Sequence, residues 1–143
     1  MRTLALDVGT RTIGVAISDP LGIIAQPVTT IQRTGRKADT AEVMAIVADR
    51  EVGRIVVGLP IRQDGTEGDS AAEARRMVAA IEASLAEAER EVPVLLEDER
   101  YTTAQAERSL IKSGVRRKKR KKVIDQVAAV LILQGHLDSG GGR

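Results

Sequence analysis

The sequence predicts an α/β fold in which a mixed β-sheet is packed against helices. Two observations carry this prediction. Short apolar and β-branched segments bounded by Gly or Pro alternate with segments whose apolar residues recur at helical spacing. The first three apolar segments are separated only by turns, whereas the later ones are separated by helices, so antiparallel and parallel pairing should both occur.

The chain should open with a three-stranded antiparallel meander. Residues 3–8 and 13–18 form two apolar runs joined by a turn that contains Gly9. A third strand is expected over residues 25–31, which are rich in β-branched residues and follow a turn that contains Pro and Gly.

Helices and strands should alternate over the rest of the chain. Two helices are expected to begin at capping boxes, Ser70 to Glu73 and Thr102 to Gln105. The predicted elements are a helix over 40–50, a strand over 54–60, a helix from 70 to about 90, a strand over 92–97, a helix from 102 to 114 and a last helix over 123–137.

The length of 143 residues favours one domain. The order of elements contains no repeat and no linker, so we expect a single domain over residues 1–138 and a frayed tail over 139–143. The N-terminus has no signal-peptide pattern and no stretch is apolar enough to span a membrane, so the protein is expected to be cytoplasmic and not to bind membranes.

Several classes of site are excluded by composition. The chain has no cysteine and one histidine, His136, which excludes disulfides, thiolate catalysis, iron–sulfur clusters and cysteine-ligated zinc. The only aromatic residue is Tyr101, so a nucleic-acid site built on base stacking is excluded as well. Any metal would need oxygen ligands.

The positive charge is concentrated in one segment. Seven of the 22 Lys and Arg residues lie in residues 116–122, and the other 15 are outnumbered by 20 Asp and Glu. Such a block is typical either of a solvated loop or exposed helix start, or of a surface that follows a phosphate backbone without reading sequence. We define the basic run as Arg116, Arg117, Lys118, Lys119, Arg120, Lys121 and Lys122.

Acids at three places could carry chemistry. Asp7 ends the first strand, Asp98 and Glu99 follow the strand over 92–97, and Asp125 stands on a helix face with Ala128 and Ala129. Each acid also has a simple structural explanation, since Asp7 could order a turn and the others could complement a helix dipole. Because the chain offers these acids but no Cys and only one His, a bound metal would be Mg²⁺ or Mn²⁺. Two such ions could activate a water molecule that hydrolyses a phosphodiester.

Four motifs resemble the YqgF/RuvX family of Holliday junction resolvase-like nucleases. They cover nearly the whole chain, in order and at matching spacing. The motifs are Asp7-Val8-Gly9-Thr10-Arg11-Thr12-Ile13-Gly14-Val15-Ala16, Val56-Val57-Gly58-Leu59-Pro60 with Gly65, Asp98-Glu99-Arg100-Tyr101-Thr102-Thr103, and Asp125-Gln126-Val127-Ala128-Ala129 with Leu131-Ile132-Leu133-Gln134.

The resemblance implies an RNase H-like fold, with a five-stranded mixed sheet and helices on both faces. It implies a nuclease that processes the 5′ end of pre-16S rRNA or resolves branched DNA, with structured RNA or branched DNA as its partner. By motif position, Asp7, Glu99 and Asp125 would be the catalytic metal ligands, with Asp98 as a substitute or supporting ligand. Tyr101 departs from the Leu that many relatives carry, without affecting the acids.

Arg11 and Arg100 would hold the scissile phosphate or order the carboxylates in this interpretation, although ordinary ion pairing explains them nearly as well. The basic run would bind the nucleic-acid backbone. His136 is expected to be a helix-terminus residue, not a catalyst.

Two alternatives compete. Asp7-Val8-Gly9-Thr10 also resembles the phosphate loop of sugar kinases and actin-like ATPases, but those bind nucleotide between two domains and 143 residues leave no room for a second. The other alternative is a non-catalytic nucleic-acid-binding ribosome-assembly factor, against which the presence of acids at all three motif positions argues. No feature of the sequence indicates an oligomeric state.

Overall fold

The computed structural model describes residues 1–99 and 117–141, with the side chains of residues 1–99 and 126–140. Five strands form one mixed sheet in the order β3-β2-β1-β4-β5. The β1–β2 and β2–β3 pairs are antiparallel, and the β1–β4 and β4–β5 pairs are parallel. The strands are β1 (Arg2–Val8), β2 (Thr12–Ser18), β3 (Ala25–Gln32), β4 (Val52–Leu59) and β5 (Val94–Asp98).

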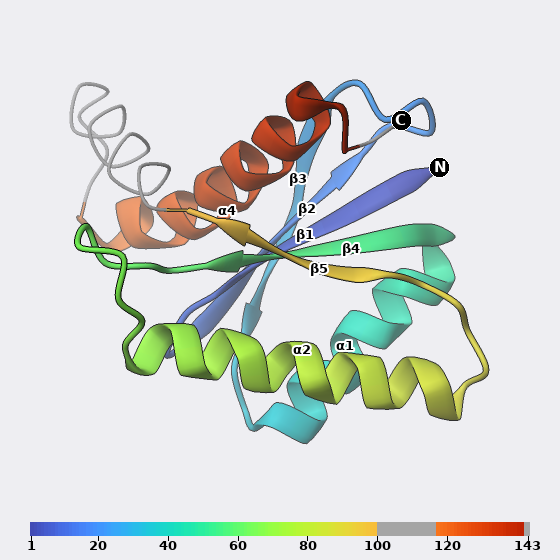
Figure 1. Cartoon of the computed structure of the whole chain (residues 1–143), viewed down its shortest axis with the longest axis horizontal. Coiled ribbons are helices and arrows are strands. Elements are labelled where there is room, and N and C mark those ends of the chain that lie inside the picture. Colours follow the sequence, from blue (N-terminus) through green and yellow to red (C-terminus); the bar gives the residue numbers. More distant parts are fainter. Residues whose placement is uncertain (100–116, 142–143) are drawn as a thin grey trace.

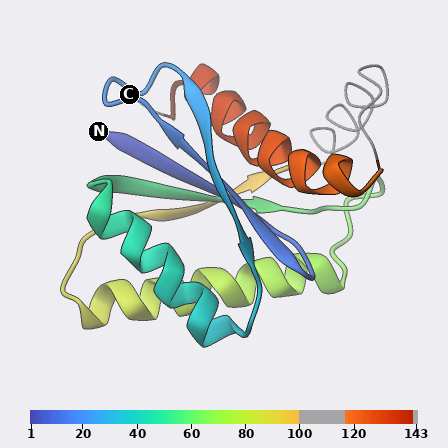
Figure 2. The ribbon, with the colours of Figure 1, turned by 180° about the vertical axis from the view of Figure 1, so that it is seen from behind.

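Helices cover both faces of this sheet. Helices α1 (Arg36–Asp49) and α2 (Asp69–Glu87) lie on one face, and α4 (Arg117–His136) crosses the other (Figures 1 and 2). A π-helical turn, η1 (Leu137–Gly141), follows α4. The predicted five-stranded mixed α/β sheet with helices on both faces is therefore confirmed.

The two faces of the sheet pack differently. Bulky aliphatic residues, among them Leu4, Leu6, Ile55 and Met77, fill the space beneath α1 and α2. Smaller residues pack beneath α4, in a cluster of Ala5, Ala16, Ala129, Leu133 and Leu137. Small side chains let α4 approach the sheet closely, so polar groups from sheet and helix can meet on this face.

Two helices begin earlier than their apolar periodicity predicts. Helix α1 begins at Arg36 instead of residue 40, and α4 begins at Arg117 instead of residue 123. In both cases the first turns carry charged residues, so a search for apolar spacing misses them. Lys and Arg nevertheless have good helix propensity, and part of the basic run lies in the first two turns of α4.

The capping box at Ser70 was a wrong prediction. Helix α2 begins at Asp69 after Gly68, and no side chain caps it. Glu73 instead pairs with arginines from outside its own first turn, as described below. The helix predicted over 102–114 lies outside the described residues.

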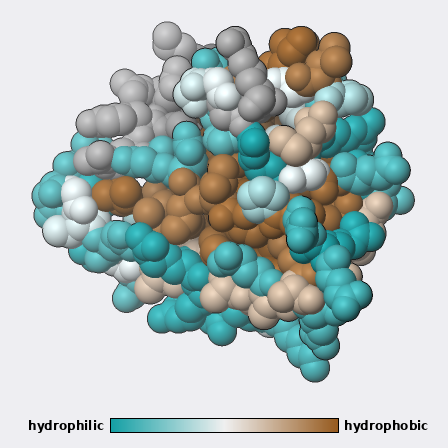
Figure 3. All heavy atoms as spheres, turned by 45° about the vertical axis from the view of Figure 1, so that its right-hand side comes forward, coloured by the Kyte–Doolittle hydropathy of each residue, from teal (hydrophilic) through white to brown (hydrophobic). Residues whose placement is uncertain are grey.

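On the face drawn in Figure 3, most of the apolar surface forms a band. Seen from the side, it runs through the middle of the molecule between polar surface above and below, with a second apolar group at the upper right (Figure 3). The edge strand β5 contributes to the exposed apolar surface through Leu95. No helix in the described part of the chain is long and apolar enough to cross a membrane.

Candidate active site

Asp7 lies at the carboxyl end of the central strand β1 and faces α4. Side chains alternate along a strand, and Ala5, two residues earlier, belongs to the cluster beneath α4. Leu6 and Val8 point to the opposite core. An acid is therefore placed on the α4 face at the edge of the sheet where strands β1, β4 and β5 all end.

Glu99 meets Asp7 at this edge. Its amide donates to the carbonyl oxygen of Leu59 at 3.2 Å, which continues the β5–β4 pairing one residue past the strand. The Glu99 side chain is buried, with 8% of the residue exposed. Burial, the neighbouring charge of Asp7, a hydrogen bond with Asp7 and the charge of Asp98 raise the pKa of Glu99 to about 8.

Gly58 makes room for this buried carboxyl group. A Cβ atom at Gly58 would collide with the carboxylate of Glu99 and with the side chain of Ile132 in α4. A glycine one residue before the end of β4 thus lets a strand-end acid and a helix side chain occupy the same small space. The motif Val56 to Pro60 therefore contributes to the site because Gly58 has no side chain.

The structure separates the two acids at the end of β5. Asp98 is exposed, whereas Glu99 is buried against Gly58 and Asp7. Alternation along the chain directs the two side chains to opposite faces. Of the two, Glu99 has the position from which it can share a ligand with Asp7, and the charge of Asp98 helps to raise the pKa of Glu99.

The backbone of α4 brings residue 125 to the same end of the sheet. Asp7 pairs with Gly14, and Gly14 pairs with Thr30, so these three residues form one row across β1, β2 and β3. The amide Nε2 of Gln126 donates to Oγ1 of Thr30 at 2.9 Å. Asp125 precedes Gln126 in α4, and its side chain lies outside the described residues.

Only some of the remaining predicted site residues lie within the described part of the chain. Arg11 is exposed in the turn between β1 and β2. Arg100 and Arg116 lie outside the described residues, and residues 117–122 are described only by their helical backbone. His136 stands in the last turn of α4, buried, with Nδ1 3.8 Å from Oε2 of Glu97, as expected for a helix-terminus residue.

Two of the three predicted ligands, Asp7 and Glu99, are placed where they could bind a hard divalent cation. Asp7 and Glu99 offer adjacent carboxylate oxygens, and their mutual repulsion when both are ionised would fall beside a cation. Within the described part of the chain no group of three acidic or imidazole side chains is placed to hold a metal. The third predicted ligand, Asp125, is the one whose side chain is not described.

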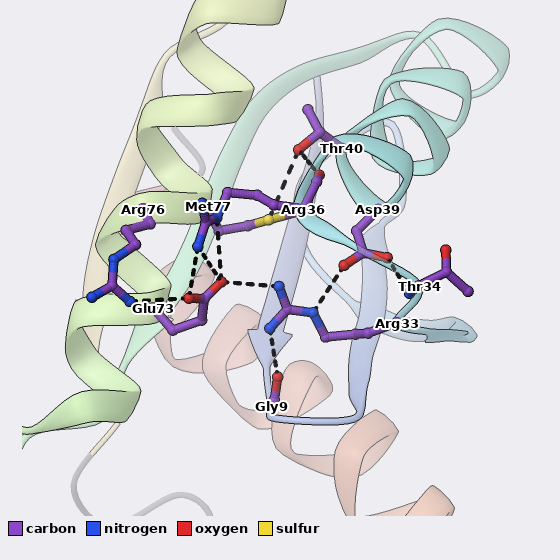
Figure 4. Close-up of polar contacts among 9 residues, drawn as sticks. All are labelled: Gly9, Arg33, Thr34, Arg36, Asp39, Thr40, Glu73, Arg76 and Met77. Carbon is purple, nitrogen blue, oxygen red and sulfur yellow. Dashed lines mark hydrogen bonds and ion pairs between the residues drawn. The ribbon is translucent and has the colours of Figure 1, made fainter.

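A second polar cluster lies behind the β1–β2 turn, and sequence reasoning missed it. Arg33, just after β3, donates from Nη1 to the carbonyl oxygen of Gly9, from Nε to Asp39 and from Nη2 to Glu73, at 2.9 to 3.0 Å (Figure 4). Arg36 and Arg76 also pair with Glu73. The arginine cluster, by which we mean Arg33, Arg36, Arg76, Asp39 and Glu73, adjoins a cavity of about 490 Å³, which is lined by all of these residues except Arg36.

These arginines shift the titration of Glu73. The hydrogen bond from Arg36 and those from Arg33 and Arg76 outweigh burial and lower the pKa of Glu73 to about 2. The carboxylate stays ionised at neutral pH and links α2 to Arg36 of α1 and to Arg33, which follows β3. The sequence pattern does not predict the contact between Arg33 and Glu73, because the two residues are 40 positions apart.

Comparisons with known proteins agree on the family. A family model described as "RuvX: Holliday junction resolvase" matches residues 1–139. A Myxococcus xanthus protein named "Putative pre-16S rRNA nuclease" is 48% identical over 139 residues, covering 97% of this chain and 89% of the relative. A Thermoanaerobacter pseudethanolicus protein of the same name is also 48% identical, covering 97% of both chains.

Solved structures resemble the chain in fold at low sequence identity. The fowlpox virus resolvase in complex with Holliday junction DNA matches with a TM-score of 0.63 and 12% identity, covering 97% of this chain and 98% of the other. Thermus thermophilus RuvC in complex with a Holliday junction matches with a TM-score of 0.58 and 15% identity, covering 99% and 96%. These likenesses confirm the expected RNase H-like fold.

Proposed function

The chain belongs to the RuvX family, and from this premise we propose that it is a metal-dependent endonuclease that processes the 5′ end of pre-16S rRNA. The observation that carries the proposal is the pairing of Asp7 with buried Glu99 on the face covered by α4. Two adjacent carboxyl groups are costly to keep at a sheet edge without a function. The names of the relatives supply the substrate class.

Asp7, Glu99 and Asp125 would hold one or two Mg²⁺ or Mn²⁺ ions, with Asp98 as a supporting charge. Such ions, when bound, activate water and stabilise the leaving oxygen of a phosphodiester. The protein's own part is to hold the carboxylates at fixed positions: β1 places Asp7, Gly58 leaves space for Glu99, and Ile132 of α4 packs against that same space. Arg11 would contact the phosphate from the adjacent turn.

The basic run supports a polyanionic substrate. Its residues from Arg117 onward occupy the first two turns of α4, and no acid lies in the first turn of that helix. Positive side chains at a helix N-terminus are unfavourable for the helix dipole. The same arrangement adds the dipole to the side-chain charge as an attraction for phosphate, which favours a nucleic-acid strand entering over this end of the sheet.

The test is cleavage of a 5′-labelled pre-16S leader RNA with Mg²⁺, with Mn²⁺ and with EDTA. We expect the wild-type chain to cut only with metal and Asp7→Asn to cut at least about 100-fold more slowly. Asp98→Asn is the matched control, because it removes a neighbouring charge from the opposite face, and should stay within about tenfold of wild type. Binding of the RNA without cleavage under all conditions would favour the ribosome-assembly factor instead.

Branched DNA is the second candidate substrate, favoured by the description of the family model and by the resolvase folds. The same assay with a four-way DNA junction separates the two. Faster single-turnover cleavage of the junction than of the leader RNA would assign the chain to junction resolution. In either case the reaction would take place in the cytoplasm.

A further inference from the structure

We propose that Arg33 is the positioning residue of the carboxylate site: it fastens the β1–β2 turn, and through it Asp7, to the helices on the opposite face of the sheet. This rests on the proposed function. Asp7 lies two residues before Gly9, whose carbonyl oxygen accepts from Nη1 of Arg33 at 2.9 Å. The backbone amide of Arg33 donates to the carbonyl oxygen of Arg11 at 2.9 Å, so one residue holds both sides of the turn.

The anchors of Arg33 are themselves fixed. Asp39, 1% exposed in its side chain, accepts from Nε of Arg33 and from the Thr34 amide at 3.0 Å. Glu73, in α2, accepts from Nη2 of Arg33 and from Arg36 and Arg76. The Arg33 side chain is only 11% exposed, so the guanidinium joins the turn to α1 and α2 in one geometry (Figure 4).

Within the described residues, the hydrogen bond from Arg33 to Gly9 links the helices on that side to the turn. Its own bond, from the Gly9 amide to the Thr12 carbonyl oxygen at 2.8 Å, closes the loop locally but does not tie it to the helices. The cavity of about 490 Å³ lies between the turn and the N-terminal halves of α1 and α2, with Gly9 and Thr10 in its lining. Packing therefore cannot replace the hydrogen bond of Arg33 there.

Arginine is required because three nitrogen atoms donate in three directions. A lysine keeps the charge but presents one nitrogen, which cannot serve Gly9, Asp39 and Glu73 together. Loss of the Gly9 contact should let the end of β1 shift, and a misplacement of about 1 Å in a reacting group costs about 100-fold in rate. Substrate binding should change little, because Arg33 lies behind the site.

The experiment compares Arg33→Lys with Arg76→Lys, its matched control. Arg76 borders the same cavity and pairs with Glu73, but does not touch the turn. We expect Arg33→Lys to lower the single-turnover rate of leader cleavage by about 10- to 100-fold with the Kd for RNA unchanged within about twofold. It should also weaken Mg²⁺ binding in calorimetry several-fold and speed hydrogen exchange of the Gly9 amide at least about tenfold. Arg76→Lys should leave all four quantities within about twofold.

Several outcomes would overturn the proposal. Among them are a normal cleavage rate in folded Arg33→Lys, an unchanged Gly9 exchange rate, or an equal loss in Arg76→Lys. If Arg33→Lys does not fold, Asp39→Asn, which removes the charge and turns one of the two accepting oxygens into a donor, should give the same pattern more weakly, and a normal rate there contradicts the role. If the wild-type chain cleaves no substrate, the proposed function fails, and Gly9 exchange and Mg²⁺ affinity still decide on Arg33.

Discussion

The raised pKa of Glu99 predicts how metal-free stability depends on pH. Burial and the charge of Asp7 raise this pKa to about 8, above the ordinary value of 4.5. The folded state therefore holds a proton that the unfolded state releases, and this contribution is complete below pH 4.5 and lost as pH rises through about 8. We expect the free energy of unfolding in EDTA to fall on the order of 2 kcal/mol between pH 5 and pH 9.

Urea titrations at the two pH values measure this loss. Mg²⁺ should restore much of the stability at pH 9, since it binds the ionised pair only in the folded chain. Glu99→Gln should show a flatter profile in EDTA. A wild-type profile as flat as that of the variant would mean that Glu99 is ionised throughout and not buried beside Asp7.

Gly58→Ala tests the space beneath α4. The added methyl group would meet the Glu99 carboxylate and the Ile132 side chain, so both must move. We expect a loss of about 1–3 kcal/mol in stability and at least about tenfold in cleavage rate. Gly53→Ala is the control in the same strand, because its methyl group would meet only the flexible side chain of Met1. Equal effects of the two variants would remove Gly58 from the site.

At the residue scale, the sequence predicted site residues where a charged side chain directly follows an apolar strand. Asp7 and Glu99 follow apolar strands, so their meeting at one sheet edge could be expected from the order of strands, and the structure brings them together. The role of Gly58 could not be read in the same way, because it depends on what α4 places above it. The role of Arg33 could not be predicted from its neighbours in the sequence, since its partners come from three separate segments.

At the scale of elements, Glu73 should matter to α2 as an ion-pair acceptor and not as a cap. The lowered pKa of Glu73, about 2, means that its contribution is present above pH 4.5 and is lost as pH falls through about 2. We expect Glu73→Gln to cost on the order of 2 kcal/mol at pH 7 and almost nothing at pH 2, and thermal or urea unfolding at both pH values measures the difference.

Ser70→Ala is the companion variant for the start of α2. Because no side chain caps this helix, we expect a change within about 0.5 kcal/mol. A functional cap would instead cost about 1 kcal/mol. A loss that large in Ser70→Ala, together with a neutral Glu73→Gln, would restore the capping box and contradict the ion-pair interpretation.

The elements themselves were predictable to the extent that apolar spacing marks them. Strands β1 and β2 lie close to their predicted ranges because their apolar runs end at Gly or at charged residues. Helices α1 and α4 were predicted too short because their first turns are charged, and pattern reasoning treats charged turns as loop. The start of α1 is instead held by Asp39, which accepts hydrogen bonds from the Thr34 amide and from Arg33.

At the scale of the whole molecule, charge and buried packing occupy different parts of α4. Residues 117–122 of the basic run form the first two turns of α4, near the edge of the sheet where β4 and β5 end, while Ala129 and Leu133 further along the helix pack on Ala5 and Ala16. Helix α4 therefore has charged first turns and a second half that is buried against the sheet. Its stability should come from the buried half, so charges in the other half can be removed without unfolding the domain.

Replacing Lys118, Lys119, Arg120 and Lys121 with Ser should therefore weaken nucleic-acid binding alike for all sequences and leave the fold intact. If these residues neutralise about three phosphates, the slope of log K against log salt should fall by roughly 2 for single strands and nearly 3 for B-form duplex. Single-turnover cleavage at saturating substrate should survive, because only ground-state binding is removed. Salt titrations and single-turnover kinetics on the same variant check both statements. An unchanged slope would mean that the basic run does not touch the strand, and a collapsed rate at saturation would place one of its cations at the reacting phosphate.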